Sequence, residues 1–261
     1  GVVGPGWGVV FARAGLPVVL HDAQGAQLGG ARTAIEASLA DLARQGLLRE
    51  PVEEVAARIQ AVGSLESALD GVDYVQESIV ERLDDKRRLY AAMDAIAAPA
   101  TILASSTSAF PTSAMAEGLA GGSRCIVAHP VNPPYLVPLV EVSGAPFTSD
   151  ETVRRTLALQ RAVGQAPIHV RREVHGFVLN RLQWTLLAEA CVLVADGIAS
   201  VDDVDAAVRD GLGRRWALLG PFEVGDLNAP RALRDYLERF GPTIEPTNAA
   251  SGSRLEPSQW E

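Results

Sequence analysis

The sequence holds few of the features that mark secreted or membrane proteins. Cysteine occurs only twice, at Cys125 and Cys191, and each lies inside an apolar run. Two isolated cysteines favour a reducing cytosol over a disulfide framework. No apolar run reaches the roughly 18 residues of a membrane-spanning helix, and no signal peptide is visible. We therefore expect a cytoplasmic protein without a membrane partner.

Basic residues are also scarce, with 23 Lys and Arg against 32 Asp and Glu and a formal net charge of -9. Nucleic acids and anionic membranes are bound through basic patches, so we expect neither as a partner. Hydrophobic residues make up 48% of the chain of 261 residues. That content is enough for a sizeable core in one large domain or two smaller ones.

Short apolar segments alternate with helical patterns up to residue 170. Such alternation predicts an α/β fold with a mostly parallel sheet and helices on both faces. Apolar residues at helical spacing predict helices over 24–49 and 83–97. Strands are expected at 17–21, 60–63, 73–77, 101–105, 125–128, 137–142 and 167–170.

After residue 170 the strand pattern stops. The segment 177–195 carries leucines on one helical stripe, and Gly197 follows it as an expected helix stop. We expect helices and loops from there, and a loop in the polar tail from Glu245 onward. The sequence therefore predicts an α/β domain over 1–172 and an all-helical domain over 173–261.

Glycines at the start of the chain fit part of a dinucleotide-binding turn. The fingerprint G-x-G-x-x-G joins a strand to a helix and has an acidic residue about 20 positions later. Gly1 and Gly4 fit its second and third glycines, and Asp22 follows Gly4 by 18 residues at the end of a strand. A carboxylate there accepts hydrogen bonds from the adenosine ribose and repels a 2′-phosphate, which favours NAD over NADP.

This register has a structural consequence. The strand and first glycine of the fingerprint would lie before Gly1, so we expect a gap in the sheet where that strand belongs. Gly1 is then expected at the carboxyl edge of the sheet. The alternative is a glycine-rich terminus that merely precedes a strand.

The stretch "CIVAHPVNPPYLVPLVEV" is the candidate catalytic segment. His129 follows a buried strand, and Glu141 lies on the next strand. If the strands are neighbours, the carboxylate fixes one imidazole nitrogen and leaves the other to accept a proton. The alternative is a histidine that caps a turn and a glutamate on a solvated edge. The hydroxyls of 105–108 and the amide of Asn180 are further candidates.

Together these segments resemble the L-3-hydroxyacyl-CoA dehydrogenase superfamily, and within it the λ-crystallin or L-gulonate 3-dehydrogenase branch. The resemblance implies a Rossmann-like NAD-binding domain, then a helical domain that usually forms a dimer interface, with further helices after 241–242. No metal is implied. The matching motifs are "GVVGPGW", "ESIVERLDDK", "SSTS", "IVAHPVNPPY", "PLVEV", "GFVLNRLQ", "GLGRRWALLGPFE" and "DLNAP".

The resemblance also assigns roles to four residues. His129 would be the general base that removes the 3-hydroxyl proton as hydride passes to NAD, and Glu141 would hold and polarise its imidazole. Ser108 would hydrogen-bond the substrate oxygen, and Asn180 would orient substrate and histidine.

Two further residues match positions that line the cofactor and substrate cleft of the family. These are Glu81 and Lys86, within "ESIVERLDDK". The alternative for both is a solvated, salt-bridged helix start.

Two substrates and one non-catalytic role stay open. Arg214 and Arg215 lie in an expected loop of the helical domain. In the members of the resembled superfamily that act on CoA thioesters, this segment carries small or neutral residues. A guanidinium binds a free carboxylate in bidentate fashion, so we expect Arg215 to recognise a small 3-hydroxy acid such as L-gulonate. A surface arginine at a helix end is the alternative. An L-3-hydroxyacyl-CoA of fatty acid metabolism is the second substrate candidate. A crystallin-like structural role is the third hypothesis, and it would not require His129.

Overall fold

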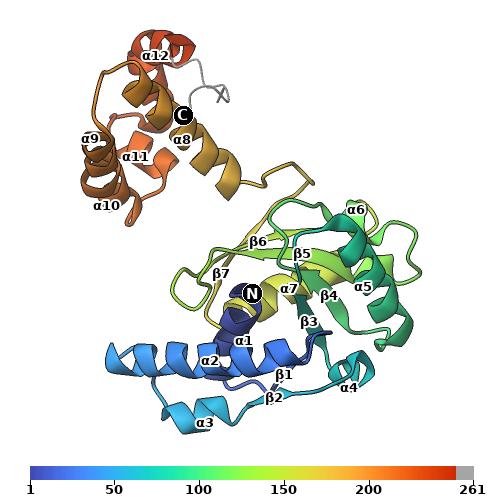
Figure 1. The fold of residues 1–261 in the computed structure, drawn as a ribbon. Helices are drawn as coiled ribbons and strands as arrows, with labels where there is room; N and C mark the ends of the chain where they lie inside the picture. The colour runs from blue at the N-terminus through green and yellow to red at the C-terminus, as the bar shows by residue number, and fades with distance from the viewer. Residues whose placement is uncertain (251–261) are drawn as a thin grey trace. The chain divides into compact units, whose positions relative to one another are not determined.

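The computed structural model describes the backbone of residues 1–250 and the side chains of residues 1–243. The chain forms two compact units, which we call the sheet unit, Gly1–Leu179, and the helical unit, which begins at Asn180. The sheet unit carries all strands of the described residues (Figure 1). Each unit is described by itself below.

The strands of the sheet unit form two separate sheets. Strands β1 and β2 form a parallel pair, and the second sheet has the order β3-β4-β5-β6-β7. All neighbours in the second sheet are parallel except β5 and β6, which run antiparallel. The expected mostly parallel sheet is therefore confirmed. The strands are β1 Val18–Leu20, β2 Ile59–Ala61, β3 Tyr74–Glu77, β4 Ile102–Ser105, β5 Cys125–Pro130, β6 Leu139–Ser143 and β7 Ala166–His169.

The gap expected from the glycine register is present between β1 and β3. Within residues 1–250 no backbone pairing joins these two strands. Helix α1, Val3–Arg13, contacts both of them. A Cβ added at Gly4 would lie 3.7 Å from Cβ of Ser78, which directly follows β3. The start of α1 therefore lies at the carboxyl end of β3, where the register predicts it.

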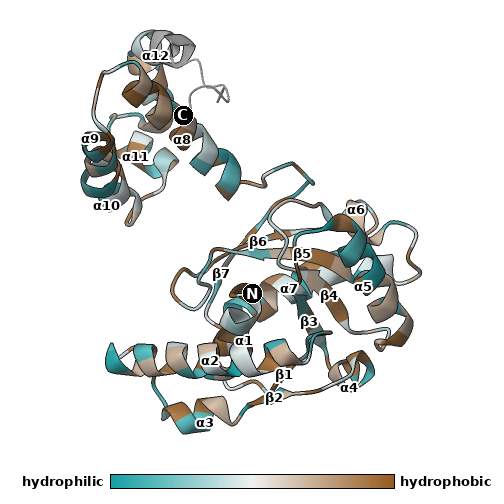
Figure 2. Cartoon of the chain, viewed as in Figure 1, coloured by the Kyte–Doolittle hydropathy of each residue, from teal (hydrophilic) through white to brown (hydrophobic). Residues whose placement is uncertain are grey.

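Alternating side chains of the central strands face two different helix layers. One face, with Leu103, Cys125 and Val127, packs against α5 and α6. The opposite face, with Ile102, Ala104, Ile126 and Ala128, packs against α1 and α7. Strands β4 and β5 are brown over much of their length in Figure 2, as a strand buried on both faces requires. The helices named here are α5 Leu83–Ile96, α6 Thr112–Ala116 and α7 Asp150–Ala162.

Helices α2 and α3 pack with α1 around β1 and β2 in a third apolar cluster. Helix α2, Ala26–Arg44, ends before the predicted residue 49 because Gly46 adopts a left-handed φ of 68°. Short helices complete the sheet unit: α3 Val52–Ala56, α4 Leu65–Leu69 and the 3-10 turn Gly122–Arg124.

The helical unit corrects two sequence predictions. Arg214 and Arg215 lie on helix α10 rather than in a loop, because a π-helical segment continues the preceding helix up to Leu212 and α10 begins at Gly213. The predicted tail loop is wrong up to Ala250, since α12 runs through Pro242 and Pro246; the rest of the tail, 251–261, lies outside the described residues. The elements are α8 Leu179–Ala195, α9 Val201–Ala206, the π-helix Ala207–Leu212, α10 Gly213–Trp216, α11 Pro221–Leu227 and α12 Ala232–Ala250.

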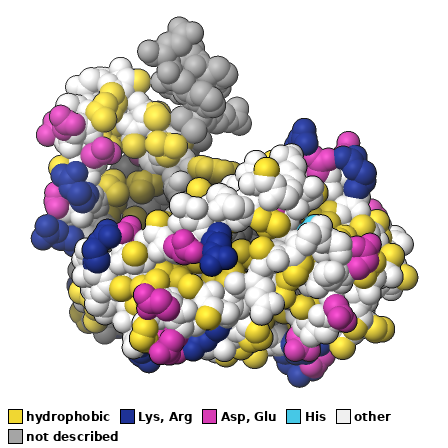
Figure 3. All heavy atoms as spheres, turned by 60° about the horizontal axis from the view of Figure 1, so that its bottom comes forward, with side chains coloured by type: hydrophobic (Ala, Val, Ile, Leu, Met, Phe, Trp, Pro, Cys, Tyr) yellow, Lys and Arg dark blue, Asp and Glu magenta, His cyan; other side chains and the backbone are white. Residues whose placement is uncertain are grey.

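Two surface properties accompany this fold. None of the described helices is both long and apolar enough to cross a bilayer. On the face drawn in Figure 3, basic and acidic side chains are interspersed, and the basic ones do not merge into a continuous patch.

Candidate active site

His129 and Glu141 lie directly opposite each other on β5 and β6. The Nδ1 atom of His129 is 2.8 Å from Oε2 of Glu141. Both side chains are buried, with His129 7% and Glu141 0% exposed. The prediction that the two strands are neighbours is confirmed. His129 lies within β5 rather than just after it, and Glu141 lies on β6 as expected. The solvated-edge alternative for Glu141 is wrong.

The second oxygen of Glu141 is held by backbone amides at the start of α8. Val178 N and Leu179 N donate to Oε1 at 2.7 and 2.9 Å. Burial alone would raise the pKa of Glu141, but the hydrogen bonds from His129 and from the Leu179 and Val178 amides together lower it. The carboxylate therefore stays ionised beside the imidazole.

Phe177 lies over the imidazole and was not identified from the sequence. Its ring centroid is 5.4 Å from that of His129, and its side chain is 1% exposed. Gly176 and Phe177 adopt φ values of 75° and 48°, so both are in the left-handed region. A non-glycine residue held there costs about 1–3 kcal/mol. The turn leads directly into the two amides that hold Glu141, so one short segment contacts both members of the pair.

Hydroxyl groups at 105–108 occupy different environments. Ser105 donates to the Glu77 carboxylate, and Thr107 donates to Glu81. Ser106 bonds with several polar side chains on the α1 face of the sheet, while Ser108 is exposed just beyond β4. The partners of the Ser106 Oγ are Trp7, Gln76 and Ser78. Exposure therefore distinguishes Ser108, the residue that the resemblance assigns to substrate binding.

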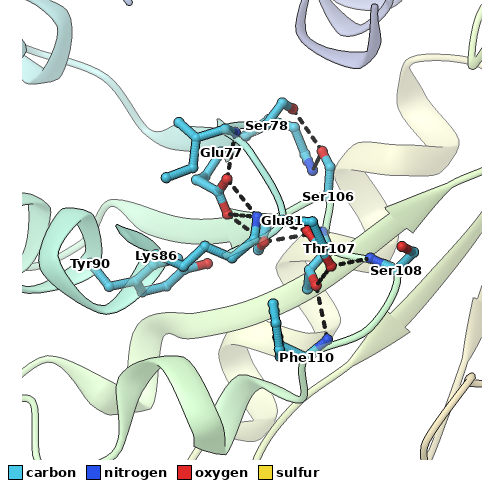
Figure 4. Close-up of polar contacts among 12 residues, drawn as sticks. Glu77, Ser78, Glu81, Lys86, Tyr90, Ser106, Thr107, Ser108 and Phe110 are labelled. Atoms are coloured by element: carbon cyan, nitrogen blue, oxygen red, sulfur yellow. Dashed lines mark hydrogen bonds and ion pairs between the residues drawn. The ribbon is translucent and has the colours of Figure 1, made fainter. Parts of the chain in front are cut away.

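Lys86 is the only lysine in the sequence, and it is buried. Its Nζ donates to both carboxylate oxygens of Glu77 at 2.9 and 3.1 Å and lies 3.2 Å from Oε2 of Glu81 (Figure 4). The solvated helix start considered as the alternative is therefore wrong for Lys86. Glu81 is the half-exposed member of this group, with 36% of its side chain accessible. Direct cofactor contacts of Glu81 and Lys86 stay predictions.

The residues assigned to the dinucleotide lie around the start of α1 and the end of β1. Asp22 comes two residues after β1, and its Oδ1 accepts a hydrogen bond from Gln24 N at 2.8 Å. Helix α1 has no side-chain cap and no acidic residue in its first turn. An uncapped helix start binds phosphate oxygens through its amides, so these residues fit the pyrophosphate and ribose of NAD. A cavity of about 300 Å³ adjoins this turn and is lined in part by Val2, Pro5 and Gly6.

Asn180 and Arg215 belong to the helical unit, so their predicted contacts with substrate stay predictions. Arg215 lies on α10 beside Arg214, which forms an ion pair of 3.2 Å with Asp210.

Family comparisons agree with this arrangement over most of the chain. Residues 1–174 match the NAD-binding domain of 3-hydroxyacyl-CoA dehydrogenase, and residues 176–254 match the C-terminal domain of the same enzyme. The chain belongs to the 3-hydroxyacyl-CoA dehydrogenase family. It is accordingly an NAD-dependent oxidoreductase that acts on CH–OH groups.

Relatives of similar sequence identity have different names. The chain is 42% identical to λ-crystallin of Oryctolagus cuniculus, over 97% of this chain and 80% of that protein. It is 38% identical to L-carnitine dehydrogenase of Pseudomonas aeruginosa, over 94% of this chain and 76% of that enzyme. The sequence identities of the chain to these two proteins are similar, so family membership alone does not identify the substrate.

Solved structures of the family also superpose well on the chain. A 5-dehydrogenase of 5-formyl-3-hydroxy-2-methylpyridine 4-carboxylic acid, described as an NAD-dependent dismutase, has a TM-score of 0.86 at 28% identity and covers 98% of this chain and 80% of its own. The 3-hydroxybutyryl-CoA dehydrogenase of Escherichia coli has a TM-score of 0.76 at 30% identity, over 87% of this chain and 47% of its own.

The position of Asp22 leads to a prediction about cofactor choice. Asp22→Ser should raise the ratio of NADP to NAD turnover by about tenfold or more, because the repulsion between the carboxylate and a 2′-phosphate is removed. Steady-state kinetics with both cofactors measures the ratio. The matched control is Asp41→Ser, which removes an exposed carboxylate from α2. An unchanged ratio in Asp22→Ser would contradict the ribose assignment.

Proposed function

We propose that the protein oxidises the 3-hydroxyl of a small L-3-hydroxy acid, of the L-gulonate type, with NAD as the hydride acceptor. The observation that carries the proposal is the buried His129–Glu141 pair at 2.8 Å, with Glu141 held by two backbone amides. An ionised carboxylate on Nδ1 fixes the imidazole tautomer and stabilises the imidazolium. The Nε2 atom is then the proton acceptor.

The residues divide the work of the reaction. His129 Nε2 removes the proton of the C3 hydroxyl, so the electrons of the O–H bond form the carbonyl as the C3–H bond breaks. Bound NAD would supply the acceptor for the hydride of C3. Glu141 compensates the positive charge that His129 acquires. Ser108 donates a hydrogen bond to the substrate oxygen, and Asn180 orients the substrate against the imidazole.

The cofactor assignment follows the same proposal. Gly1 and Gly4 would allow the pyrophosphate to approach the start of α1, and Asp22 would accept hydrogen bonds from the adenosine ribose. Glu81 is half-exposed beside the Ser108 loop, which is consistent with a position that lines the cleft. Lys86 would act behind it, since its side chain is 1% exposed.

A free carboxylate is the favoured recognition group of the substrate. Arg215 supplies a guanidinium on α10, whereas the neighbouring Arg214 forms an ion pair with Asp210. The identity of 42% with λ-crystallin supports the same choice. A CoA thioester is the second candidate, because a 3-hydroxyacyl-CoA dehydrogenase of Gibberella moniliformis is 39% identical over 94% of the chain.

Paired substrate assays test the proposal. We expect NADH formation with L-gulonate at alkaline pH and a kcat/KM at least tenfold lower with L-3-hydroxybutyryl-CoA. Arg215→Met should raise KM for the free acid about tenfold or more, since a charge-assisted bidentate pair is lost. Arg214→Met is the matched control and should change KM little.

Each outcome of these assays separates the hypotheses. A preference for the thioester, with KM unchanged in Arg215→Met, would support a 3-hydroxyacyl-CoA as the substrate and would contradict the assignment of a free acid. No turnover of either substrate would support the crystallin-like structural role.

We further propose that the helical unit forms a homodimer and that the protein is cytoplasmic. Several of its large apolar side chains are exposed, among them Leu218 at 85%, Leu227 at 73% and Phe222 at 72%. Apolar exposure of this extent is typical of surfaces that are covered by a partner subunit.

A further inference from the structure

A buried ion pair lies on the same face of the sheet as the candidate catalytic pair. Glu77 ends β3 and is paired in register with Ser105, which ends β4. Val75, Leu103 and Val127 contribute to the apolar cluster of that face, so the alternation of each strand directs Glu77, Ser105 and His129 to it as well. Glu77 is 4% and Lys86 1% exposed. Two charges buried in an apolar layer therefore lie at the carboxyl end of the sheet.

Every polar atom of the Glu77 carboxylate has a partner. Oε1 accepts from Lys86 Nζ and from Ile79 N, at 2.9 and 2.7 Å. Oε2 accepts from Lys86 Nζ at 3.1 Å and from the Ser105 hydroxyl. The carboxylate thus fixes Lys86, and it fixes Ser105, whose Oγ in turn accepts from Thr107 N at 3.1 Å.

The ammonium of Lys86 connects this pair to the loop that follows β4. Its Nζ lies 3.2 Å from Oε2 of Glu81. The other oxygen, Oε1 of Glu81, accepts from Ser108 N and Ala109 N, each at 3.1 Å, and from the hydroxyl of Thr107. Figure 4 shows the carboxylates of Glu77 and Glu81 on either side of the ammonium, with the loop beyond Glu81. Three donors of one loop therefore depend on one oxygen of Glu81.

The charge of Lys86 and the hydrogen bonds of the loop also affect the pKa of Glu81. Burial alone would raise the pKa of Glu81, but the Thr107 hydroxyl, the charge and hydrogen bond of Lys86 and the Ala109 amide together lower it. Within residues 1–243, Lys86 is the only cation that pairs with either carboxylate, and Glu77 holds it with two hydrogen bonds. If Glu77 loses its charge, Glu81 is the one carboxylate among the described residues left to pair with the buried ammonium of Lys86. We expect Lys86 to shift toward Glu81 and Glu81 to change its position as a result.

We propose that Glu77 is a positioning residue that holds the backbone of the Ser108 loop in its substrate-binding geometry through Lys86 and Glu81. The assignment of substrate contact to Ser108 rests on the proposed function, whereas the control of the loop by Glu77 does not. A purely structural ion pair is the competing interpretation. A buried ion pair adds little net stability compared with apolar residues of the same volume, which favours a role in geometry.

Hydrogen exchange tests the control of the loop without any assay of activity. Glu77→Gln should speed exchange of the Ser108 and Ala109 amides by about tenfold or more and leave the central amides of β5 unchanged. Glu117→Gln, at an exposed carboxylate, is the matched control. Unchanged exchange of the two loop amides in Glu77→Gln would overturn the proposal.

A second variant covers the case in which Glu77→Gln does not fold. Glu77→Gln with Lys86→Met replaces the buried ions by neutral side chains of similar length. Folding should recover, and the loop amides should still exchange faster than in the wild type, because Glu81 has lost its cation. Wild-type exchange in this stable double variant would establish the purely structural interpretation.

A double-mutant cycle then connects the loop to catalysis. Glu77→Gln should lower kcat by about tenfold or more in the wild type but by less than about twofold in a Ser108→Ala background, since both changes act on one contact. Equal factors in both backgrounds would contradict action through Ser108. An inactive wild type, or a Ser108→Ala variant with full kcat, would count against the proposed function, while the exchange result would still decide the control of the loop.

Discussion

His129→Gln should lower kcat by about 1,000-fold, with a change in the KM for NAD of less than about threefold. The glutamine side chain approaches the volume of the imidazole but does not accept a proton at neutral pH. Positioned general bases contribute typically about 10²–10⁴ to the rate. His129 lies on β5 and makes none of the hydrogen bonds that hold α1, so cofactor affinity should be preserved.

Steady-state kinetics and a direct NAD titration by fluorescence measure both effects. His169→Gln is the matched control, because His169 ends β7 with an exposed side chain. A kcat within tenfold of the wild type in His129→Gln would show that another group removes the proton. A parallel loss of NAD binding would point to a collapsed site instead.

Glu141→Gln should produce the largest combined loss of stability and activity. The carboxylate is 0% exposed and accepts three hydrogen bonds, from Val178 N, Leu179 N and His129. Loss of one partner of a buried charged hydrogen bond costs about 3 kcal/mol, which lowers the unfolding midpoint by roughly 6–12 °C. The kcat should fall about 100-fold, because the imidazole is no longer oriented and its positive charge is uncompensated.

The stability difference should depend on pH in one direction. The pKa of Glu141 is lowered on folding, so its stabilisation is fully present above the unfolded glutamate pKa of about 4.3. It is lost as the pH falls through the lower pKa of the folded state. The difference in thermal unfolding midpoint between wild type and variant should therefore be large at neutral pH and should narrow below pH 4. Glu151→Gln, at an exposed carboxylate of α7, should show neither gap.

The sequence predicted the elements whose signal is local. Buried strands such as β4 and β5 begin as apolar runs, and a break in the sheet was expected from the register of Gly1 and Gly4. Errors arose where local signals compete. Arg214 and Arg215 were expected in a loop, yet the π-helical segment Ala207–Leu212 leads directly into α10, with Val208 O placed 2.9 Å from where a Cβ of Gly213 would lie. Helix α12 likewise continues through Pro242.

The residues of the candidate site also fall into those that were predicted from local sequence patterns and those that were missed. His129 and Glu141 stand out because they lie twelve residues apart, on two apolar strands that a proline-rich turn connects. Phe177 and Glu77 were missed because their roles depend on contacts far along the chain: Phe177 is 48 residues from His129, and Glu77 is 28 residues from Ser105. The glycine before Phe177 and the first glutamate of "ESIVE" are the only local traces of these roles.

The fate of the hydrogen at C3 shows whether this site oxidises a 3-hydroxy acid by hydride transfer to NAD. L-Gulonate deuterated at C3 is incubated with the wild-type protein and NAD, and the mass of the reduced cofactor is measured. Direct hydride transfer beside His129 predicts reduced cofactor that carries one deuterium, and a slower rate than with unlabelled substrate. Unlabelled reduced cofactor, or none, would contradict the assignment of this site to oxidation of a 3-hydroxy acid.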